Sequence, residues 1–528
     1  MATDQTDQTE AIAFLRAHDS AGPAKASEVI QTHCALVFLH GTEALKIKRA
    51  VKYDYLDFST LALREDMLRR EMALNADAAP GLYHDVAALT RQPDGGIAFG
   101  GDGEIVEWVL RMTRFPKSAE LSSMAKAGEI DTQLSEALGE AIARYHASAE
   151  RRPEDGRALI AEIIAELDRV MSDMHAQLGP ERIKAFLQGS RAALDRADAL
   201  LRRRSELGFV RRCHGDLHLR NIIMWQGVPT PFDALEFDER LGTCDVLYDL
   251  AFLLMDLSHQ HLNAQANGVL NAYLFNSGAE EHYAGLAALP LYLAIRAGIR
   301  AMVDVQTAAV QDYPADLVAD ARLFLDQANA FLTPAPPRLV AIGGLSGSGK
   351  TTVARALAPD IGAFPGAVHL RSDLERKAHF GVPIIEKLPA SAYRPEVSEK
   401  IYDIMIAKAR RTLAAGHSVI LDAVYAKPAE RDAVAAFAGA VGCPFHGLWL
   451  DAATPLRVER VGARGPDASD ADAAIARQQD ALQLGEIDWL RLDAGKRVSD
   501  LLMAIRQSLG LNNLERPDQG NHDQQDAE

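Results

Sequence analysis

The sequence has few cysteines and no segment suited to secretion or membrane insertion. Its four cysteines, Cys34, Cys213, Cys244 and Cys443, lie far apart and form no CxxC pair, which counts against a disulfide framework and a cysteine-based zinc site. The first residues, MATDQTDQTE, are polar and acidic, and the chain has no apolar run of the length that spans a membrane. These absences predict a cytoplasmic protein with no membrane partner.

An excess of basic charge is also missing. Lysine and arginine number 56 against 73 aspartates and glutamates, which gives a formal net charge of −17. Such acidity aids solubility and counts against general binding to nucleic acid or to anionic membranes, although it leaves room for a local basic pocket. Small molecules are therefore favoured as partners.

The chain is long enough for several hydrophobic cores. Its 528 residues, 48% of them apolar, predict two or three domains. The stretch TPAPP at 333–337 is typical of an extended proline-rich linker. We therefore place one domain over residues 1–332 and another over 338–512, and we expect the polar residues 513–528 to form a disordered acidic tail.

The first domain changes its pattern part-way along. CALVFLH and EALKIKRAV flank a Gly-Thr turn and predict two antiparallel strands. Residues 60–79 have leucines and methionines at helical spacing, and residues 97–112 predict another hairpin. Ala-, Leu-, Glu- and Arg-rich segments follow. The order predicts an α+β domain with a strand-rich small lobe over about 25–112 and a helical lobe over about 113–332.

The second domain alternates strands with helices. RLVAIGGL, AVHLRSD, SVILDAV and FHGLWLDA are strand-like runs separated by helical segments. This βα rhythm predicts an α/β domain with a parallel sheet and helices on both faces. A glycine-rich loop joins the first of these strands to the helix that follows it.

That loop fits the P-loop pattern in full. Glycines allow backbone N–H groups to converge on phosphate oxygens, and the following helix directs its positive end at the same anion. The lysine would reach the β- and γ-phosphates of ATP, and the threonine hydroxyl would ligate Mg²⁺. The alternative is a glycine-rich turn without a ligand. The residues expected to bind nucleotide are Gly344, Ser346, Gly347, Ser348, Gly349, Lys350, Thr351 and Thr352.

Three further side chains are candidates for the same site. Asp422 ends the strand SVILDAV and is expected to support Mg²⁺, and Ala423 follows it where motor ATPases generally place a glutamate. Asp373 follows another strand and is expected to engage the acceptor hydroxyl, or alternatively to cap the next helix. Arg376 lies nearby and could contact an anionic acceptor.

Arginines near a Gly/Asp-rich segment suggest a lid that neutralises charge on the transferring phosphoryl group. Arg464 immediately precedes this segment and is the preferred residue, with Arg457 and Arg460 as alternatives. With these motifs, residues 338–510 resemble the P-loop kinases that include polynucleotide 5′-kinases, gluconate kinases and zeta-toxin-like kinases.

A second phosphotransfer motif lies in the first domain. His214-Gly215-Asp216 is followed by Asn221, which is the H-x-D-x-x-x-x-N spacing of a kinase catalytic loop. The aspartate would accept the proton of the attacking hydroxyl, and the asparagine would ligate Mg²⁺. A zinc site built from His214, Asp216 and His218 is an alternative interpretation of the same segment.

This motif resembles the aminoglycoside phosphotransferases, which share the bilobal protein-kinase-like fold. The resemblance covers about residues 25–330 and implies that Asp233 is the second metal carboxylate, with Glu236 and Asp238 as alternatives. It also implies that Lys46 binds phosphate and that Glu71 orients it. Lys48 competes with Lys46, because alternation places both on one face of the strand. Asp249 would be a structural hydrogen-bond acceptor.

The whole chain resembles bacterial proteins described as bifunctional aminoglycoside phosphotransferase/ATP-binding proteins. That resemblance implies an ATP- and Mg²⁺-dependent phosphotransferase with two kinase-like domains and small-molecule hydroxyl acceptors. Two alternatives stay open. In the first, one half is a regulatory ligand-binding module without activity, since no GxGxxG loop is present and Ala234 and Leu235 follow Asp233. In the second, the P-loop domain is a nucleic-acid 5′-end kinase, against which the acidity counts.

Overall fold

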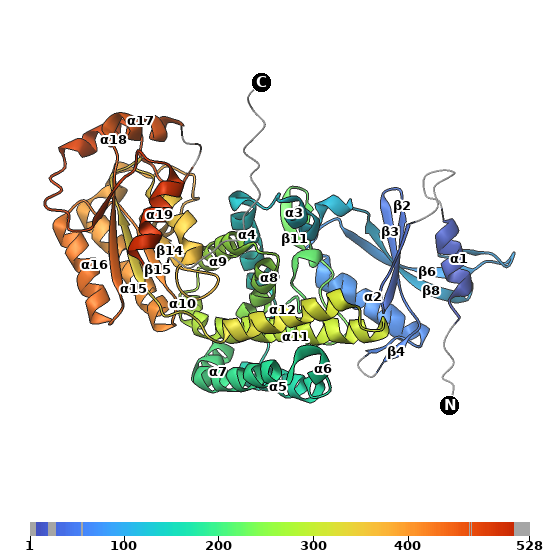
Figure 1. Ribbon diagram of the computed structural model, residues 1–528. Helices are drawn as coiled ribbons and strands as arrows, with labels where there is room; N and C mark the ends of the chain where they lie inside the picture. The colour runs from blue at the N-terminus through green and yellow to red at the C-terminus, as the bar shows by residue number, and fades with distance from the viewer. Residues whose placement is uncertain (1–6, 19–27, 54–55, 464, 466, 512–528) are drawn as a thin grey trace, which may run out of the picture. The chain divides into compact units, whose positions relative to one another are not determined.

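The computed structural model of the protein describes residues 7–18, 28–53, 56–463, 465 and 467–511. It divides into two compact units. The first holds Met1–Gly278 and Leu291–Leu332, and the second holds Ala279–Pro290 and Thr333–Glu528. The tail predicted at 513–528 lies outside the described residues. Each unit is described by itself below, and Figure 1 labels the elements of both.

The small lobe of the first unit is built on a six-stranded antiparallel sheet in the order β1-β2-β3-β8-β6-β7. Helices α1 (Thr9–Ala17) and α2 (Leu61–Asn75) pack on opposite faces of this sheet, each against its own apolar cluster. Strands β4 and β5 form a separate antiparallel pair. The strands are β1 (Glu28–Gln31), β2 (Ala35–His40), β3 (Glu43–Lys48), β4 (Lys52–Tyr53), β5 (Leu56–Asp57), β6 (Tyr83–Arg91), β7 (Ile97–Phe99) and β8 (Ile105–Thr113).

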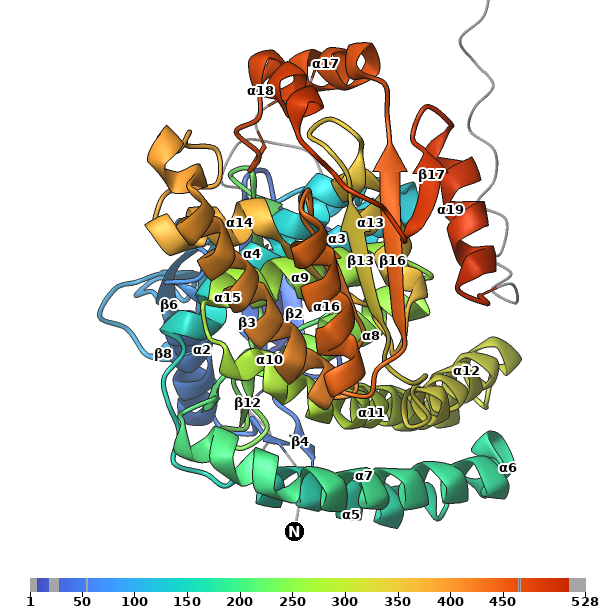
Figure 2. The same ribbon diagram turned by 90° about the vertical axis from the view of Figure 1, so that its left-hand side faces the viewer.

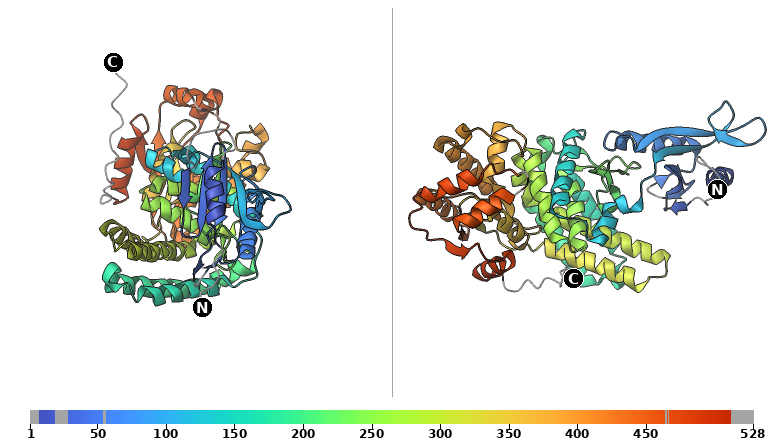
Figure 3. Two further views of the ribbon diagram at one scale, coloured as in Figure 1. Left: turned by 90° about the vertical axis from the view of Figure 1, so that its right-hand side faces the viewer. Right: turned by 90° about the horizontal axis from the view of Figure 1, so that it is seen from above.

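The predicted strands at 34–51 and the helix at 60–79 are confirmed as β2, β3 and α2, but the hairpin expected at 97–112 is wrong. Strands β7 and β8 do not pair with each other; both pair with β6, which lies between them in the sheet. The physical reason is that the long strand β6, which was not predicted, has two free edges and pairs with β7 along one and with β8 along the other. Figure 3 shows the resulting ribbon in light blue.

The remainder of the first unit is mostly helical, as predicted, and α5 and α7 lie side by side in it (Figure 2). Its helices are α3 (Leu121–Ala127), α4 (Thr132–Ser148), α5 (Gly156–Met171), α6 (His175–Leu178), α7 (Pro180–Glu206), α8 (Val246–His259), α9 (Asn263–Ser277), α11 (Leu289–Val310) and α12 (Ala315–Phe331). Its short strands pair as β9 (Val210–Arg212) with β12 (Thr243–Asp245), and β10 (Ile222–Trp225) with β11 (Val228–Pro231).

One helical stretch is long and apolar enough to cross a membrane by length and composition. It covers Glu281–Val310, and 67% of its most apolar window is buried inside the protein. Arg296 in this stretch is buried and makes hydrogen bonds to backbone carbonyls. Burial of this kind is the pattern of a core helix.

The second unit is a parallel α/β domain, as predicted. Its five-stranded sheet has the order β14-β15-β13-β16-β17, and all neighbouring strands are parallel. Helices α13 and α19 pack on one face, and α15 and α16 pack on the other (Figure 2). The strands are β13 (Leu339–Gly343), β14 (Val368–Arg371), β15 (Val419–Asp422), β16 (Phe445–Asp451) and β17 (Leu490–Asp493). The helices are α13 (Lys350–Leu357), α14 (Ser372–Phe380), α15 (Pro395–Ala414), α16 (Pro428–Ala440), α17 (Thr454–Ala463), α18 (Ala473–Gln478) and α19 (Val498–Ser508).

The second unit also includes a short segment from before the linker. Helix α10 (Glu281–Gly285) packs against α15. Lys408 lies 5.3 Å from the centre of the Tyr283 ring, and the buried ring of His417 bonds the Leu286 carbonyl at 3.1 Å. A chain cut at the linker would therefore remove part of this unit's packing.

Candidate active sites

The glycine-rich loop of the second unit has the backbone that a phosphate cradle requires. Gly347 and Gly349 have φ angles of 83° and 89°, a region that favours glycine. A Cβ atom on Gly347 would lie 2.5 Å from the carbonyl oxygen of Arg457. Lys350 begins α13 directly after the loop, and its ammonium group lies 3.2 Å from the Leu345 carbonyl oxygen. The loop, the lysine and the helix N-terminus therefore converge, as the motif predicts.

Asp422 lies beside this loop at the end of β15. Its carboxylate accepts a hydrogen bond from the Thr351 hydroxyl at 2.7 Å and contacts the ring of His369 at 3.2 Å. Burial alone raises the pKa of Asp422, but the hydrogen bond from His369 and the charges of Lys350 and Arg371 lower it to about 2. The structure thus brings together Thr351 and Asp422, the two oxygen donors that the sequence assigns to one cation.

Asp373 is the second residue of α14, which begins at Ser372 and has Arg371 in the N-cap position. The alternative that Asp373 caps this helix is therefore wrong. Burial raises its pKa, and the nearby charge of Asp422 adds to the effect against the opposing charges of Arg371 and Lys350. The carboxyl groups of Asp373 and Asp422 thus have pKa values shifted in opposite directions.

The predicted arginines have different environments. Arg376 is buried, bonds the carbonyl oxygen of Ala392 at 2.6 Å and stacks on Tyr393, so it holds the loop before α15. Arg457 is 1% exposed and ion-paired with Asp480. The guanidinium of Arg460 lies beside Gly349 in the cradle. Arg464 lies outside the described residues.

A network of four ion pairs forms the corresponding centre of the first unit. Glu71 of α2 binds two lysines of β3, with its carboxylate oxygens 2.6 Å from Lys46 Nζ and 2.7 Å from Lys48 Nζ. Lys46 also pairs with Asp233 at 2.7 Å, and Lys48 pairs with Glu236 at 2.5 Å. Lys48 is 1% exposed, whereas the side chain of Asp233 is 41% exposed. Lys46 therefore faces the accessible carboxylate, and Lys48 lies deeper.

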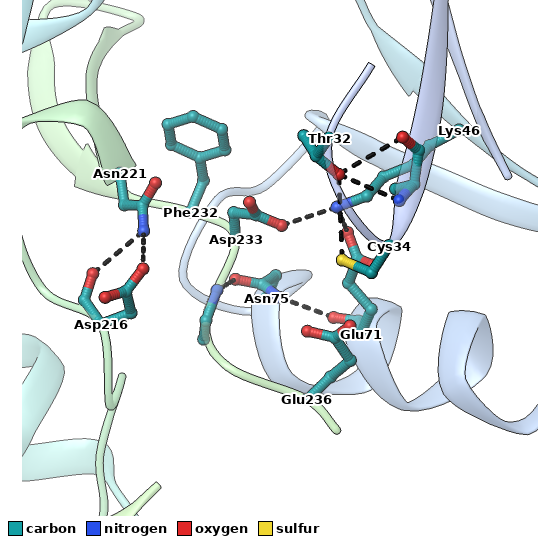
Figure 4. Close-up of polar contacts among 12 residues, drawn as sticks. Thr32, Cys34, Lys46, Glu71, Asn75, Asp216, Asn221, Phe232, Asp233 and Glu236 are labelled. Atoms are coloured by element: carbon teal, nitrogen blue, oxygen red, sulfur yellow. Dashed lines mark hydrogen bonds and ion pairs between the residues drawn. The ribbon is translucent and has the colours of Figure 1, made fainter. Parts of the chain in front are cut away.

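The backbone around Asp233 is held from the small lobe by residues that the sequence analysis missed. Asp233 has φ of 60°, and its N–H donates to the Tyr83 hydroxyl at 3.0 Å. The Ala234 N–H donates to the Asn75 side-chain oxygen at 2.9 Å, while the Asn75 amide nitrogen donates to the Glu71 carbonyl (Figure 4). Asn75 lies one helical turn after Glu71, which is the only sequence signal that could have identified it.

The catalytic-loop motif forms a compact polar pair. The Asn221 amide nitrogen donates to the Asp216 carboxylate at 2.9 Å, and the amide oxygen of Asn221 points away from that carboxylate (Figure 4). Figure 4 places Asp233 between this pair and Lys46. Burial raises the pKa of Asp216, but the charges of His218, His214 and Arg296 outweigh it and lower that pKa. Asp216 is thus held as a carboxylate.

Asp249 supports this loop from α8. Its fully buried carboxylate accepts hydrogen bonds from the N–H groups of His214 at 3.1 Å and Gly215 at 2.9 Å. His146 of α4 lies 3.2 Å from the same carboxylate and bonds the Tyr273 hydroxyl through its other ring nitrogen. Asp249 therefore lies where the predicted structural acceptor is required, and His146 is a supporting residue that the sequence analysis missed.

The zinc alternative finds no support in these contacts. The Nε2 atom of His214 is directed at the Phe232 carbonyl oxygen at 2.9 Å, whereas that of His218 is directed at Asp216 at 3.3 Å.

The two alternative carboxylates after the motif have other partners. Glu236 is paired with Lys48, and Asp238 accepts hydrogen bonds from the backbone N–H groups of Arg240 and Leu241. Among the predicted carboxylates after the motif, Asp233 is the one that lies between the catalytic pair and Lys46, to which its carboxylate is bound (Figure 4).

Relatives of the whole chain are found in mycobacteria. Proteins of Mycobacterium tuberculosis and Mycobacterium bovis named as uncharacterised are 30% identical to it over 488 residues, which cover 89% of this chain and 92% of theirs. The chain belongs to the same family as these proteins.

Both parts of the chain also match family models. Residues 96–289 match the phosphotransferase enzyme family, and residues 339–484 match an AAA domain. These matches cover the catalytic-loop motif and the glycine-rich loop respectively. The chain is a phosphotransferase with a kinase-like part and a P-loop part, as the sequence predicts.

Solved structures resemble portions of the chain. A choline/ethanolamine kinase family protein from Mesorhizobium loti is 19% identical and covers 62% of this chain and 98% of its own, with a TM-score of 0.37. A gluconokinase from Sinorhizobium meliloti is 18% identical and covers 34% of this chain and 99% of its own, with a TM-score of 0.24.

Proposed function

We propose that this chain is an ATP- and Mg²⁺-dependent enzyme with two phosphotransfer sites, each of which transfers a γ-phosphoryl group to a hydroxyl acceptor. The oxygen of the acceptor attacks the γ-phosphorus, the bond to the bridging oxygen of ADP breaks, and the hydroxyl proton leaves to a carboxylate. The observation that supports the proposal is that each unit has a carboxylate close to oxygen ligands suited to a cation: Asp216 beside Asn221 in the first unit, and Asp373 near Asp422 and its partner Thr351 in the second.

In the first unit, Asp216 is the proposed proton acceptor. The amide oxygen of Asn221 and the carboxylate of Asp233 are hard oxygen ligands of the kind that Mg²⁺ prefers. Lys46 would bind ATP phosphates while Glu71 keeps its ammonium group in place. Bound Mg²⁺ would neutralise charge on the phosphates.

In the second unit, the amides of residues 347–352 and Lys350 are proposed to bind the ATP phosphates; the Ser346 N–H, predicted to take part, is instead bound by the side chain of Gln479. Thr351 and Asp422 would supply the oxygen ligands for Mg²⁺. Asp373 is the proposed acceptor-side base, because its raised pKa suits proton uptake better than that of an ordinary aspartate. Arg460 is a described cation close to the cradle and would share in charge neutralisation.

Small hydroxyl compounds are the proposed acceptors for both sites. The net charge of −17 favours them over nucleic acid. All four cysteines are free, which supports a reducing compartment such as the cytoplasm. One observation favours the regulatory alternative for the first unit. Lys46, the proposed phosphate ligand, and Asp233, the proposed metal ligand, are paired with each other in an ion pair.

The test uses the full chain, because residues 279–290 pack in the second unit. Asp216→Asn and Lys350→Ala variants are assayed for ATP consumption and phosphorylated product over a panel of hydroxyl compounds. We expect each variant to lose a different product. If Asp216→Asn equals the unmodified protein with every acceptor, the first unit is a silent module.

Matched controls come from the same units. Asp77 is exposed in the first unit, and Lys427 has a side chain that is 60% exposed in the second. Asp77→Asn and Lys427→Ala should leave both products unchanged. Labelling of 5′-hydroxyl oligonucleotides that depends on Lys350 would instead favour a nucleic-acid end kinase.

A further inference from the structure

One residue of the phosphate cradle has all of its polar groups bound by a distant part of the chain. The N–H of Ser346 donates to the Gln479 side-chain oxygen at 2.7 Å, and the Gln479 amide nitrogen donates to the Ser346 hydroxyl at 3.0 Å. The Ser346 carbonyl accepts from the Arg457 guanidinium at 3.3 Å. A neutral side-chain amide therefore fixes the orientation of a loop whose function depends on where its amides point.

Arg457 and Gln479 belong to one locally braced piece of structure. The guanidinium of Arg457 in α17 bonds the Ala476 carbonyl of α18 at 2.9 Å and pairs with Asp480. Asp480 also accepts a hydrogen bond from Thr454 at 2.7 Å. Helices α17 and α18 and the turn at Gln479–Ala481 are thus held together, so a displacement of one is transmitted to the others.

The same piece reaches the acceptor side of the site through residues 467–472. Asp467 pairs with Arg371 at 3.0 Å, directly before α14. Asp470 pairs with the buried Lys377 of α14 at 2.6 Å and accepts a hydrogen bond from the Tyr393 hydroxyl at 2.6 Å. Ser469, between them, hydrogen-bonds the side chain of Asp373.

We propose that the described residues of α17, 467–472, α18 and the turn at 479–481 form a bridge that sets the separation between the phosphate cradle and Asp373. Gln479 is the positioning residue at the donor end, and Ser469 holds the acceptor end. The proposal rests on the phosphotransfer function proposed for this unit. Its physical reason is that transfer requires the donor phosphorus and the acceptor oxygen within a narrow range of distances, which two separately anchored loops would not maintain.

The first test compares Gln479→Leu with Gln478→Leu in the full chain. Gln478 is the exposed neighbour of Gln479, so the same substitution there is a matched control. Hydrogen–deuterium exchange is followed in peptides covering 345–352 and 467–472, with and without Mg²⁺ and AMP-PNP. In the unmodified protein and in Gln478→Leu, the nucleotide should slow exchange in both stretches.

In Gln479→Leu we expect slowing to persist at 345–352 and to disappear at 467–472. Consumption of ATP by this unit should fall about two- to tenfold, as expected for loss of neutral hydrogen bonds. Equal slowing of both stretches in Gln479→Leu would overturn the bridge. Tighter AMP-PNP binding in this variant would also overturn it, because Gln479 would then compete with phosphate for the Ser346 N–H. No slowing at 345–352 in the unmodified protein would instead contradict the proposed function itself.

The second test is a double-mutant cycle between the two ends of the bridge. Independent sites give fold-changes that multiply, whereas coupled sites do not. We expect the double variant Gln479→Leu, Ser469→Ala to be about as slow in ATP consumption as the slower single variant. A rate equal to the product of the two single effects would show that the ends act separately and would refute the bridge.

Discussion

The two proposed sites of this chain would stabilise the negative charge of ATP phosphates with different groups, mainly backbone N–H groups in one and lysine side chains in the other. The phosphate contacts proposed for the second unit come from one stretch, Gly344–Thr352, in which backbone N–H groups and a helix N-terminus supply positive potential beside the single charge of Lys350. The first unit uses two lysines of β3 and compensates them with Glu71, Asp233 and Glu236.

This difference affects the stability of the first unit, because its site contains buried charges. Charges taken out of water must be paired, and removal of one partner leaves the other uncompensated. A backbone cradle carries no such penalty, because its N–H groups are part of an ordinary loop and helix start. The first site should therefore be sensitive in stability, and the second should be sensitive mainly in activity.

The largest effect is expected from Lys48→Met, which leaves Glu236 buried without its lysine. Breaking a buried pair in this way should lower the free energy of unfolding by about 3–5 kcal/mol. Urea unfolding followed by pulsed hydrogen exchange in peptides of β2 and β3 measures this change. Lys46→Met should destabilise less, since the carboxylate of Asp233 is 41% exposed, but should abolish nucleotide binding in the first unit.

Lys52→Met is the control for this comparison. Its ammonium group pairs with Asp57 on the surface, where the Lys52 side chain is 56% exposed, so the loss should be below about 1 kcal/mol. Equal destabilisation by Lys48→Met and Lys52→Met would contradict the structural role of Lys48. The reverse pattern, with Lys48 needed for nucleotide and Lys46 for stability, would exchange the roles of the two lysines.

The next effect is expected from Lys350→Ala. Removing a preorganised charge from a phosphate site should reduce ATP consumption by the second unit by about 100- to 1,000-fold, with little change in unfolding. The assay uses the acceptor whose product survives in Asp216→Asn. A large loss of stability without a loss of turnover would reverse the contrast drawn between the two sites.

The smallest effect is a difference in pH dependence. A base acts only when ionised, and the pKa of Asp373 is raised by burial and Asp422 despite Arg371 and Lys350. That of Asp216 is lowered by His218, His214 and Arg296 despite burial. As the pH falls, the second site should therefore lose activity first. Rate profiles of Asp216→Asn and Lys350→Ala, each with one active site, measure this, and coincident acid limbs would contradict it.

Much of this organisation could be predicted from the sequence, because its strongest signals are local. The P-loop consists of consecutive residues between a strand and a helix, and the catalytic loop has fixed internal spacing. The roles expected of Lys46 and Glu71 follow from their positions on β3 and α2, although strand alternation gave no reason to prefer Lys46 over Lys48. In the structure the two lysines differ in burial and in their carboxylate partners.

The remainder depends on contacts between residues far apart in the chain. The pairing of β8 with β6 is set by the edges that the folded sheet offers, so the hairpin predicted from the nearest turn does not form. Asn75, His146 and Gln479 lie in ordinary helical or turn sequence, and only their distant partners give them a role. Arg376 has the right charge for an anion, but its partners are a backbone carbonyl, the Ser398 hydroxyl and an aromatic ring.

The most direct test of two independent nucleotide sites is calorimetric titration of the full chain with Mg²⁺ and AMP-PNP. We predict two nucleotides bound per chain, with one site lost in Lys350→Ala and the other lost in Lys46→Met. Binding of a single nucleotide, or loss of all binding in either variant alone, would contradict the account.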